Sequence, residues 1–170
     1  MPKLITKEWT FVDKTSWGPG PWQDEPDKIQ WEDKSTGLPC MIRRSPASGG
    51  LCGYVGIPSD HPYHGKSFSD LDDISVHGGL TYSAFCQTTE TGAPSELGIC
   101  HITEEKDQTW WLGFDCGHCF DHSPKFSADL KDFISAEHLI SDVGQVYRDM
   151  PYVTAETADL AKQLNEATNA

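Results

Sequence analysis

Residues 108–115 read Gln-Thr-Trp-Trp-Leu-Gly-Phe-Asp, a stretch whose large side chains alternate between two faces. By the two-residue period of a strand, Trp110, Leu112 and Phe114 share one face, and Trp111 lies on the other. This pattern predicts a strand that gives way to a loop at its last residue, an aspartate. The polar turn 104–107 precedes it, so we expect 98–103 to be the first arm of a hairpin.

Further strand-like runs precede this hairpin and are separated by turn residues. The stretch 17–27 is rich in Pro and Gly, and 58–70 is similarly interrupted, which is typical of loops. Two adjacent glycines, Gly78 and Gly79, indicate a bulge or a close backbone approach inside one run. We therefore predict strands over 8–12, 28–32, 38–43, 51–57 and 74–85.

The period of the apolar residues changes to helical spacing after Ala128 and continues to Met150. Pro151 has no backbone N–H to donate, so we expect this helix to bend or end there. A second helix is predicted over 154–166, with Thr154 as its N-cap.

Strands followed by helices predict an α+β fold. We expect one domain over 1–170, in which an antiparallel sheet of short strands is followed by two C-terminal helices packed against it. The aromatic loop 17–27 and a helical part over 128–167 would belong to this single domain.

The chain has a net charge of -13 with histidine neutral, from 26 acidic and 13 basic residues. This average field repels phosphate backbones and anionic lipid, which argues against nucleic-acid and membrane binding. No apolar run approaches the ~20 residues of a membrane helix, and the first ten residues lack a signal-like segment. The sequence therefore predicts a cytoplasmic protein with a small-molecule or protein partner.

Six cysteines would suggest disulfides in a secreted domain, but a cytoplasmic chain keeps its thiols reduced. Four of them stand singly in apolar or strand-like surroundings: Cys40, Cys52, Cys86 and Cys100. We expect these four to be free, buried thiols. Metal or redox use is the alternative.

The segment 113–122 concentrates carboxylates, imidazoles and thiols directly after the predicted strand. Such groups can bind a divalent metal, or a carboxylate can orient an imidazole as a base. The alternative is a polar loop whose groups hydrogen-bond to one another. The metal hypothesis, with zinc or manganese as the ion, takes as ligands His64, His77, Asp115, His118 and Asp121.

The predicted catalytic groups are His77, Asp115, His118 and Glu25. Glu25 stands close to Trp22, an aromatic setting that would raise the pKa of its carboxyl, and a solvated loop acid is the alternative. Trp17 and Trp22 are rigid aromatics of the kind that suit recognition, so we expect them to contact a ligand or cofactor.

Cys116-Gly-His-Cys119 matches the active-site tetrapeptide of protein disulfide isomerases. Such a site needs its first cysteine at a helix N-terminus, which lowers the pKa of the thiol. Here Ser123-Pro124 disfavours a helix at that point. Asp115 and Asp121 would also raise the thiol pKa by repelling a thiolate. A thiol-disulfide oxidoreductase is therefore only a third hypothesis.

Several motifs together resemble an uncharacterised family of bacterial and bacteriophage proteins. They span roughly residues 17–165 and are Trp17-Gly-Pro-Gly-Pro-Trp22 with Glu25-Pro-Asp-Lys28, Thr36-Gly-Leu-Pro-Cys40, Leu51-Cys-Gly-Tyr-Val-Gly56, His77-Gly-Gly-Leu-Thr81, and Trp110-Trp-Leu-Gly-Phe-Asp-Cys116 with His118. The resemblance implies a bacterial or phage setting and no particular activity. Cys119 is not a required element of that pattern, which further weakens the redox hypothesis.

Two hypotheses from different classes follow. The leading one is a metal-assisted, hydrolase-like site built from the His and Asp residues. The rival is a non-enzymatic module that binds a small ligand or a protein partner through its Trp-rich loop, as an accessory or anti-defence protein of a phage would.

Overall fold

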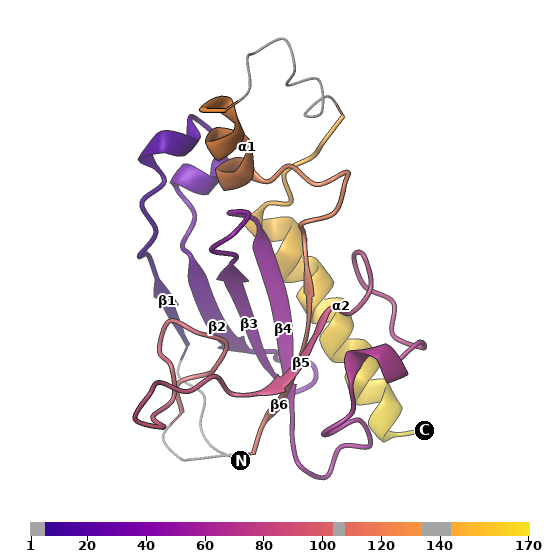
Figure 1. The fold of residues 1–170 in the computed structure, drawn as a ribbon. Helices are drawn as coiled ribbons and strands as arrows, with labels where there is room; N and C mark the ends of the chain where they lie inside the picture. The colour runs from indigo at the N-terminus through magenta and orange to yellow at the C-terminus, as the bar shows by residue number, and fades with distance from the viewer. Residues whose placement is uncertain (1–5, 104–107, 134–143) are drawn as a thin grey trace.

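The computed structural model describes residues 6–103, 108–133 and 144–170, which form an antiparallel sheet crossed by one long helix (Figure 1). The sheet has six strands in the order β1-β2-β3-β4-β6-β5. The strands are β1 Lys7–Trp9, β2 Lys28–Glu32, β3 Pro39–Arg44, β4 Leu51–Ile57, β5 Tyr82–Phe85 and β6 Trp110–Asp115. The helices are α1 Pro124–Lys131 and α2 Met150–Thr168, with short 3-10 helices η1 Thr15–Trp17, η2 Pro21–Gln23 and η3 Phe68–Asp70. The α+β class predicted from the sequence is confirmed.

The central strands of the sheet bury both of their faces. The face toward α2 is packed by aliphatic and aromatic side chains that include Leu51, Val55, Leu112, Phe114, Leu160 and Leu164. The opposite face is packed by Met41, Cys52, Tyr54, Ile99 and Trp111. The alternation predicted around Leu112 is therefore confirmed, with Trp111 on the opposite side of the sheet from its two neighbours.

Gly53 of β4 sets how closely α2 approaches the sheet. A Cβ atom at this position would overlap the ring of Phe114 and the hydroxyl of Thr157 on α2. The Thr157 hydroxyl donates to the carbonyl of Val153 at 2.7 Å, so its polar group is satisfied inside the interface. The glycine thus lets the helix lie directly on β4.

β5 covers only Tyr82–Phe85, the last third of the strand predicted over 74–85. The backbone before it turns at Gly78 and Gly79, whose φ angles are +68° and +81°. Glycine adopts these left-handed conformations without a steric cost, and they cannot continue a strand. β1 is also shorter than the predicted 8–12.

Residues 98–102 form no strand, so the hairpin predicted over 98–115 is wrong. β6 pairs with β4 and β5 instead. Buried side chains of β2 hold this region: Lys28 Nζ donates to the carbonyls of Glu96 at 2.6 Å and Cys100 at 2.8 Å. These side chains satisfy backbone groups that a neighbouring strand would otherwise bind. The predicted turn 104–107 lies outside the described residues.

The two prolines that we expected to oppose helices begin them instead. Pro124 is the first residue of α1, and Pro151 lies in the first turn of α2. The first turn needs no N–H donor and suits the fixed φ of proline. The helix predicted from residue 128 to 150 is wrong over 144–149, and its middle, 134–143, lies outside the described residues.

Asp149, rather than the predicted Thr154, caps the N-terminus of α2. Its side chain accepts a hydrogen bond from the backbone N–H of Tyr152 at 3.1 Å. This contact satisfies one of the donors that every helix leaves free at its start. The cap fixes the first turn of α2, which faces the site described below.

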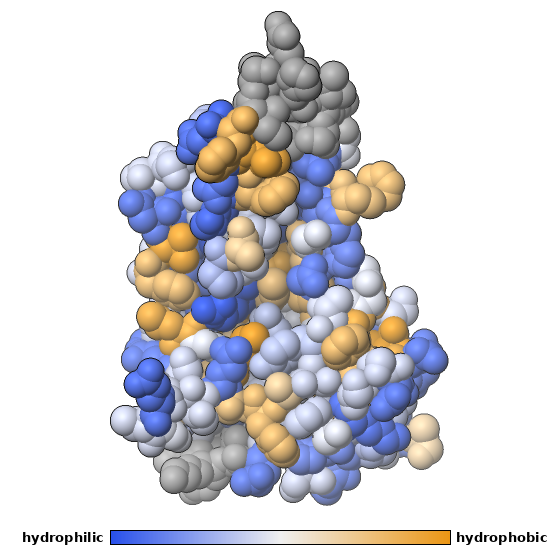
Figure 2. Space-filling model, in the orientation of Figure 1, coloured by the Kyte–Doolittle hydropathy of each residue, from blue (hydrophilic) through white to orange (hydrophobic). Residues whose placement is uncertain are grey.

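α2 packs across the sheet as predicted, whereas α1 packs against η1 near one end of it (Figure 1). Phe126 and Phe133 are 56% and 87% exposed, and apolar side chains gather over α1 on the face shown in Figure 2. Neither helix in the described part of the chain is both long and apolar enough to cross a membrane.

Cys86 and Cys100 are joined in a disulfide, which corrects the prediction that both are free. Cys40 and Cys52 are free and buried, as predicted. The disulfide connects the end of β5 to the segment held by Lys28, and its Cα atoms are 4.4 Å apart. Each cysteine stands alone in the sequence, so only the folded path of 86–100 reveals the pair.

Candidate metal centre

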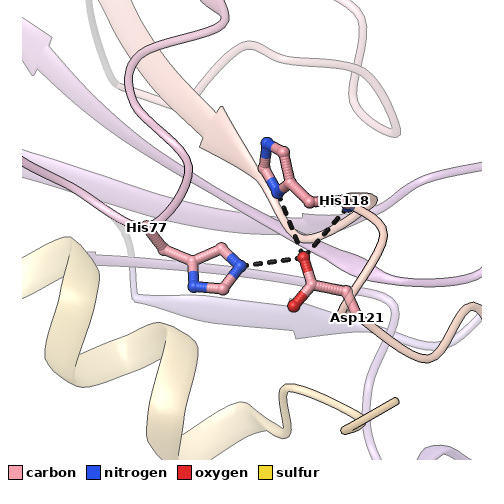
Figure 3. A group of neighbouring side chains, drawn as sticks. All are labelled: His77, His118 and Asp121. Atoms are coloured by element: carbon pink, nitrogen blue, oxygen red, sulfur yellow. Dashed lines mark hydrogen bonds and ion pairs between the residues drawn. The ribbon is translucent and has the colours of Figure 1, made fainter. Parts of the chain in front are cut away.

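Three polar side chains from distant parts of the sequence meet beside the C-terminal end of β6 (Figure 3). His77 comes from the loop before β5, while His118 and Asp121 come from the turn after β6. One potential ligand atom of each residue lies within 4.8 Å of the other two. The structure thus brings together three of the five residues predicted as metal ligands.

Asp121 is the centre of this group. Its Oδ2 atom lies 2.8 Å from His77 Nε2 and 3.1 Å from His118 Nδ1, and it accepts the backbone N–H of His118 at 3.1 Å. Its Oδ1 atom accepts from Arg148 Nε at 2.9 Å. Burial would raise the pKa of Asp121, but the hydrogen bonds outweigh burial and lower it to about 2. The carboxylate is therefore ionised at neutral pH, the form that binds metals.

His77 is held in place by two residues of α2. Its Nδ1 atom lies 2.8 Å from the hydroxyl of Tyr152, and its backbone N–H donates to Glu156 Oε2 at 3.0 Å. Tyr152 and Glu156 are four residues apart, so they project from the same face of the helix. A partner on the second ring nitrogen is the arrangement that orients metal-binding histidines.

His118 occupies space that only a glycine leaves open. A Cβ atom at Gly78 would overlap the imidazole ring of His118. The ring of His118 therefore packs directly on the backbone that follows His77, and the two ring centroids are 5.4 Å apart. The close approach expected at the glycine pair is confirmed.

Asp115 lies at the rim of the group rather than inside it. Its Oδ1 atom is 3.9 Å from His118 Nε2 and accepts the backbone N–H of Gly117 at 2.9 Å. Its side chain is 41% exposed. The carboxylate thus faces the outer nitrogen of His118, opposite the ring nitrogen that contacts Asp121.

His64, the fifth predicted ligand, is not brought to the centre. Its Nε2 atom lies 2.6 Å from the carbonyl of Gln108. Its ring packs against Phe85 and Trp110, with centroid separations of 5.6 and 6.1 Å. These contacts belong to the opposite end of β6 from the turn that carries His118.

Glu25 does not face the three ligands either. Its carboxylate accepts from the hydroxyl of Tyr147 and, at 2.6 Å, from the backbone N–H of Met150. It also forms an ion pair with Arg44 at 3.5 Å. Glu25 therefore joins the N-terminal loop to the start of α2, a structural role in place of the predicted catalytic one.

Trp17 and Trp22 are both only 7% exposed. The indole of Trp22 packs edge-on against Tyr147, with centroids 5.1 Å apart, and its N–H donates to the carbonyl of Gly18 at 3.1 Å. The two indoles therefore pack the loop against the rest of the protein. Their burial leaves neither ring as an exposed platform for a ligand.

The Cys116–Cys119 pair does not have the surroundings of a redox site. The two thiols are free, Cys116 buried and Cys119 exposed, and the tetrapeptide forms a turn rather than a helix start. Burial, together with Asp121, raises the pKa of the Cys116 thiol. An attacking thiolate is disfavoured there, so these features argue against the oxidoreductase hypothesis.

Three residues around the centre were not identified from the sequence: Arg148, Tyr152 and Glu156. Tyr152 and Glu156 are four residues apart, a spacing that places polar groups along one side of a helix, whereas Arg148 precedes α2. That signal was hidden by the expectation that Pro151 ends a helix.

Comparisons with family models, with curated proteins and with solved structures found no match for this chain.

Proposed function

We propose that the protein binds one divalent metal ion through His77 Nε2, His118 Nδ1 and Asp121 Oδ2, and that it uses the ion for hydrolysis. The observation that supports this proposal is the meeting of the three ligand atoms within 4.8 Å. Two imidazoles with one carboxylate suit zinc, and manganese is the second choice because carboxylate also suits it. Three protein ligands leave coordination positions open, as in catalytic sites.

The spacing of the ligand atoms supports the proposal further. Metal bonds of about 2.0–2.2 Å at tetrahedral angles hold neighbouring ligand atoms about 3.3–3.6 Å apart, slightly more than a hydrogen-bond distance. Asp121 Oδ2 is 2.8 Å from His77 Nε2 and 3.1 Å from His118 Nδ1. Loss of the ring protons that now face the carboxylate would let the same atoms turn toward a shared ion.

The residues behind the ligands also suit a metal. The hydroxyl of Tyr152 would accept a hydrogen bond from the N–H at His77 Nδ1, which leaves Nε2 without a proton and able to bind the metal. Arg148 occupies Asp121 Oδ1, so the carboxylate would offer a single oxygen. The positive charge of Arg148 opposes the ion, but its hydrogen bond fixes the orientation of the ligand.

Asp115 is the proposed base in place of Glu25. A bound divalent ion supplies an activated water and polarises the bond to be cleaved. Asp115 faces the outer nitrogen of His118 and is 41% exposed, so it would accept the proton through one solvent molecule that connects it to the activated water.

Elemental mass spectrometry tests the proposal on tag-free protein purified without chelators. We expect about one equivalent of zinc or manganese in the wild-type protein. His118→Ala should remove the metal, because the ring supplies a ligand atom, and its other contacts are with Gly78, His77, Asp115 and Asp121 at the same centre. His64→Ala is the matched control, since it also deletes a histidine but lies away from the centre, and it should keep the metal.

Two results would contradict the proposal. One is a wild-type protein that is metal-free as purified and takes up no zinc on titration. The other is equal metal content in His118→Ala and His64→Ala. If the metal is present, a screen of hydrolase substrates with the loaded protein tests the catalytic part separately.

Binding of a small ligand without turnover is the second candidate, and one observation favours it. A hollow of about 280 Å³ opens beside the disulfide, lined by Phe85, Cys86, Cys100, His101 and Thr109 among others. Its volume is near the lower limit of small-molecule sites. Native mass spectrometry of the purified protein would show a co-purifying ligand, and Thr109→Val should then reduce its occupancy.

A further inference from the structure

Arg148 extends from the buried carboxylate of Asp121 to the surface. Its Nε atom donates to Asp121 Oδ1 at 2.9 Å, and its guanidinium carbon lies 5.0 Å from the centre of the Tyr152 ring. The side chain of Arg148 is 24% exposed, compared with 1% for Asp121. A guanidinium therefore stands beside the candidate ligands and is open to solvent.

The hydrogen bonding of Arg148 contrasts with that of Arg44, a buried arginine of β3. Arg44 donates from Nε, Nη1 and Nη2 to groups within the protein, and its side chain is fully buried. Arg148 donates a hydrogen bond from Nε, and its Nη1 and Nη2 atoms have no hydrogen-bond partner among the described residues. A guanidinium has five N–H donors in a fork that matches phosphate or carboxylate oxygens. The terminal nitrogens of Arg148 thus remain for a ligand.

Arg148 would attract an anion to this place despite the acidity of the chain as a whole. The chain as a whole carries a net charge of -13, so anions are repelled on average. The N-terminus of α2 offers no substitute, because the backbone N–H groups of Met150 and Tyr152 are bound by Glu25 and Asp149. An anion that reaches the centre would therefore be attracted by the metal and by Arg148.

We propose that the substrate of the centre carries an anionic oxygen group, a phosphate or a carboxylate, and that Arg148 binds it beside the metal. This inference rests on the proposed metal-binding function. The competing explanation is that Arg148 only neutralises Asp121. The two explanations predict different anion affinities after Arg148 is substituted in a protein that keeps its metal: a loss of affinity if Arg148 binds the anion, and no change if it only neutralises Asp121.

Isothermal titration of the zinc-loaded protein with inorganic phosphate and, separately, with acetate tests the proposal. Arg148→Gln should weaken binding of the preferred anion about 10- to 100-fold, the worth of a charge-assisted hydrogen bond. Lys162→Gln removes the same charge from an exposed position of α2 and should leave the affinity unchanged. Zinc content and thermal melting are measured for each variant, and Arg148→Lys replaces Arg148→Gln if the latter does not fold.

The outcomes separate the two proposals. Loss of anion binding with zinc retained supports the role of Arg148, and the anion that binds more tightly identifies the substrate class. Equal anion affinity in Arg148→Gln and wild type, or no binding of either anion by the loaded wild type, overturns it while leaving the metal site standing. Loss of zinc in Arg148→Gln also overturns it, because Arg148 would then only position Asp121. A wild type that binds no zinc refutes the metal site, and phosphate titration of that metal-free protein then decides whether Arg148 binds an anion.

Discussion

The imidazole of His118 fills the space that a Cβ atom on Gly78 would occupy. Gly78→Ala should therefore displace the ring and lower zinc affinity by about tenfold or more, since supporting contacts of metal ligands have effects of about 10–100-fold. Gly79→Ala is the matched control, because Gly79 also has a positive φ but no atom lies within 4 Å of its added methyl group. Both variants should lose about 1 kcal/mol of stability from backbone strain. Equal zinc affinities in a competition titration would refute the role of the close approach.

Asp121 should make the metal-free protein sensitive to acid. Its pKa is about 2 in the folded protein and has an ordinary value of 3.8, so the folded state favours the ionised form. The resulting stability is present above about pH 4 and is lost as the pH falls toward 2, and it amounts to about 2 kcal/mol. The difference in unfolding free energy between wild type and Asp121→Asn should shrink by that amount between pH 5 and 2 in urea titrations. A difference that stays constant with pH would contradict the prediction.

The Cys86–Cys100 disulfide should be detectable by counting thiols. Denatured, unreduced protein should react with a thiol reagent at four cysteines, and reduced protein at all six. The bridge closes a loop with a sequence separation of 14, so Cys86→Ser with Cys100→Ser should cost about 3 kcal/mol. Cys119→Ser, an exposed free thiol, should leave the melting temperature unchanged. Six reactive thiols before reduction would show that the bridge does not form.

Asp27 should be essential for stability, because it balances two buried cations. Its side chain is fully buried and binds Lys14 at 2.9 Å and Arg44 at 2.7 Å. Burial would raise the pKa of Asp27, but hydrogen bonds from Lys14, Val12 and Arg44 outweigh burial and lower it. Asp27→Asn leaves Lys14 without this counter-charge and Arg44 with Glu25 as its remaining ion-pair partner, and it should cost about 3–5 kcal/mol in urea unfolding. Asp24→Asn, an exposed neighbour, should be nearly neutral, and similar losses in both variants would show that the buried charge is not the cause.

The strands could be predicted where a single run of sequence contains the whole signal. The runs 28–32 and 51–57 became β2 and β4 with the predicted bounds, because both are short strand-like runs bounded by turn residues. The run 98–103 failed because its backbone is bound by Lys28 and Gln30, side chains some 70 residues away in the sequence. Nothing within that run indicates such partners.

The site was predictable in its chemistry and only partly in its membership. The ligand types near Asp115 and the glycines after His77 were visible in the sequence, and three of the five expected ligands meet. Tyr152 was missed because Pro151 was expected to end a helix, and Arg148 because its contact with Asp121 joins residues 27 positions apart. Pro151 instead stands in the first turn of α2, and the Asp149 cap is the contact that makes a proline favourable there.

The sequence by itself determined the α+β class and the types of side chain that are available to bind a metal, because periodicity and residue type act over short stretches of chain. The tertiary structure alone decided that His77 joins His118 and Asp121, that His64 and Glu25 do not, and that Cys86 pairs with Cys100. These outcomes depend on strand order and on close packing, as at Gly78, where one missing methyl group lets two distant loops touch. The contacts of His77 with Asp121 and of Gly78 with His118 join residues 40 or more positions apart, and local sequence patterns carry no record of them.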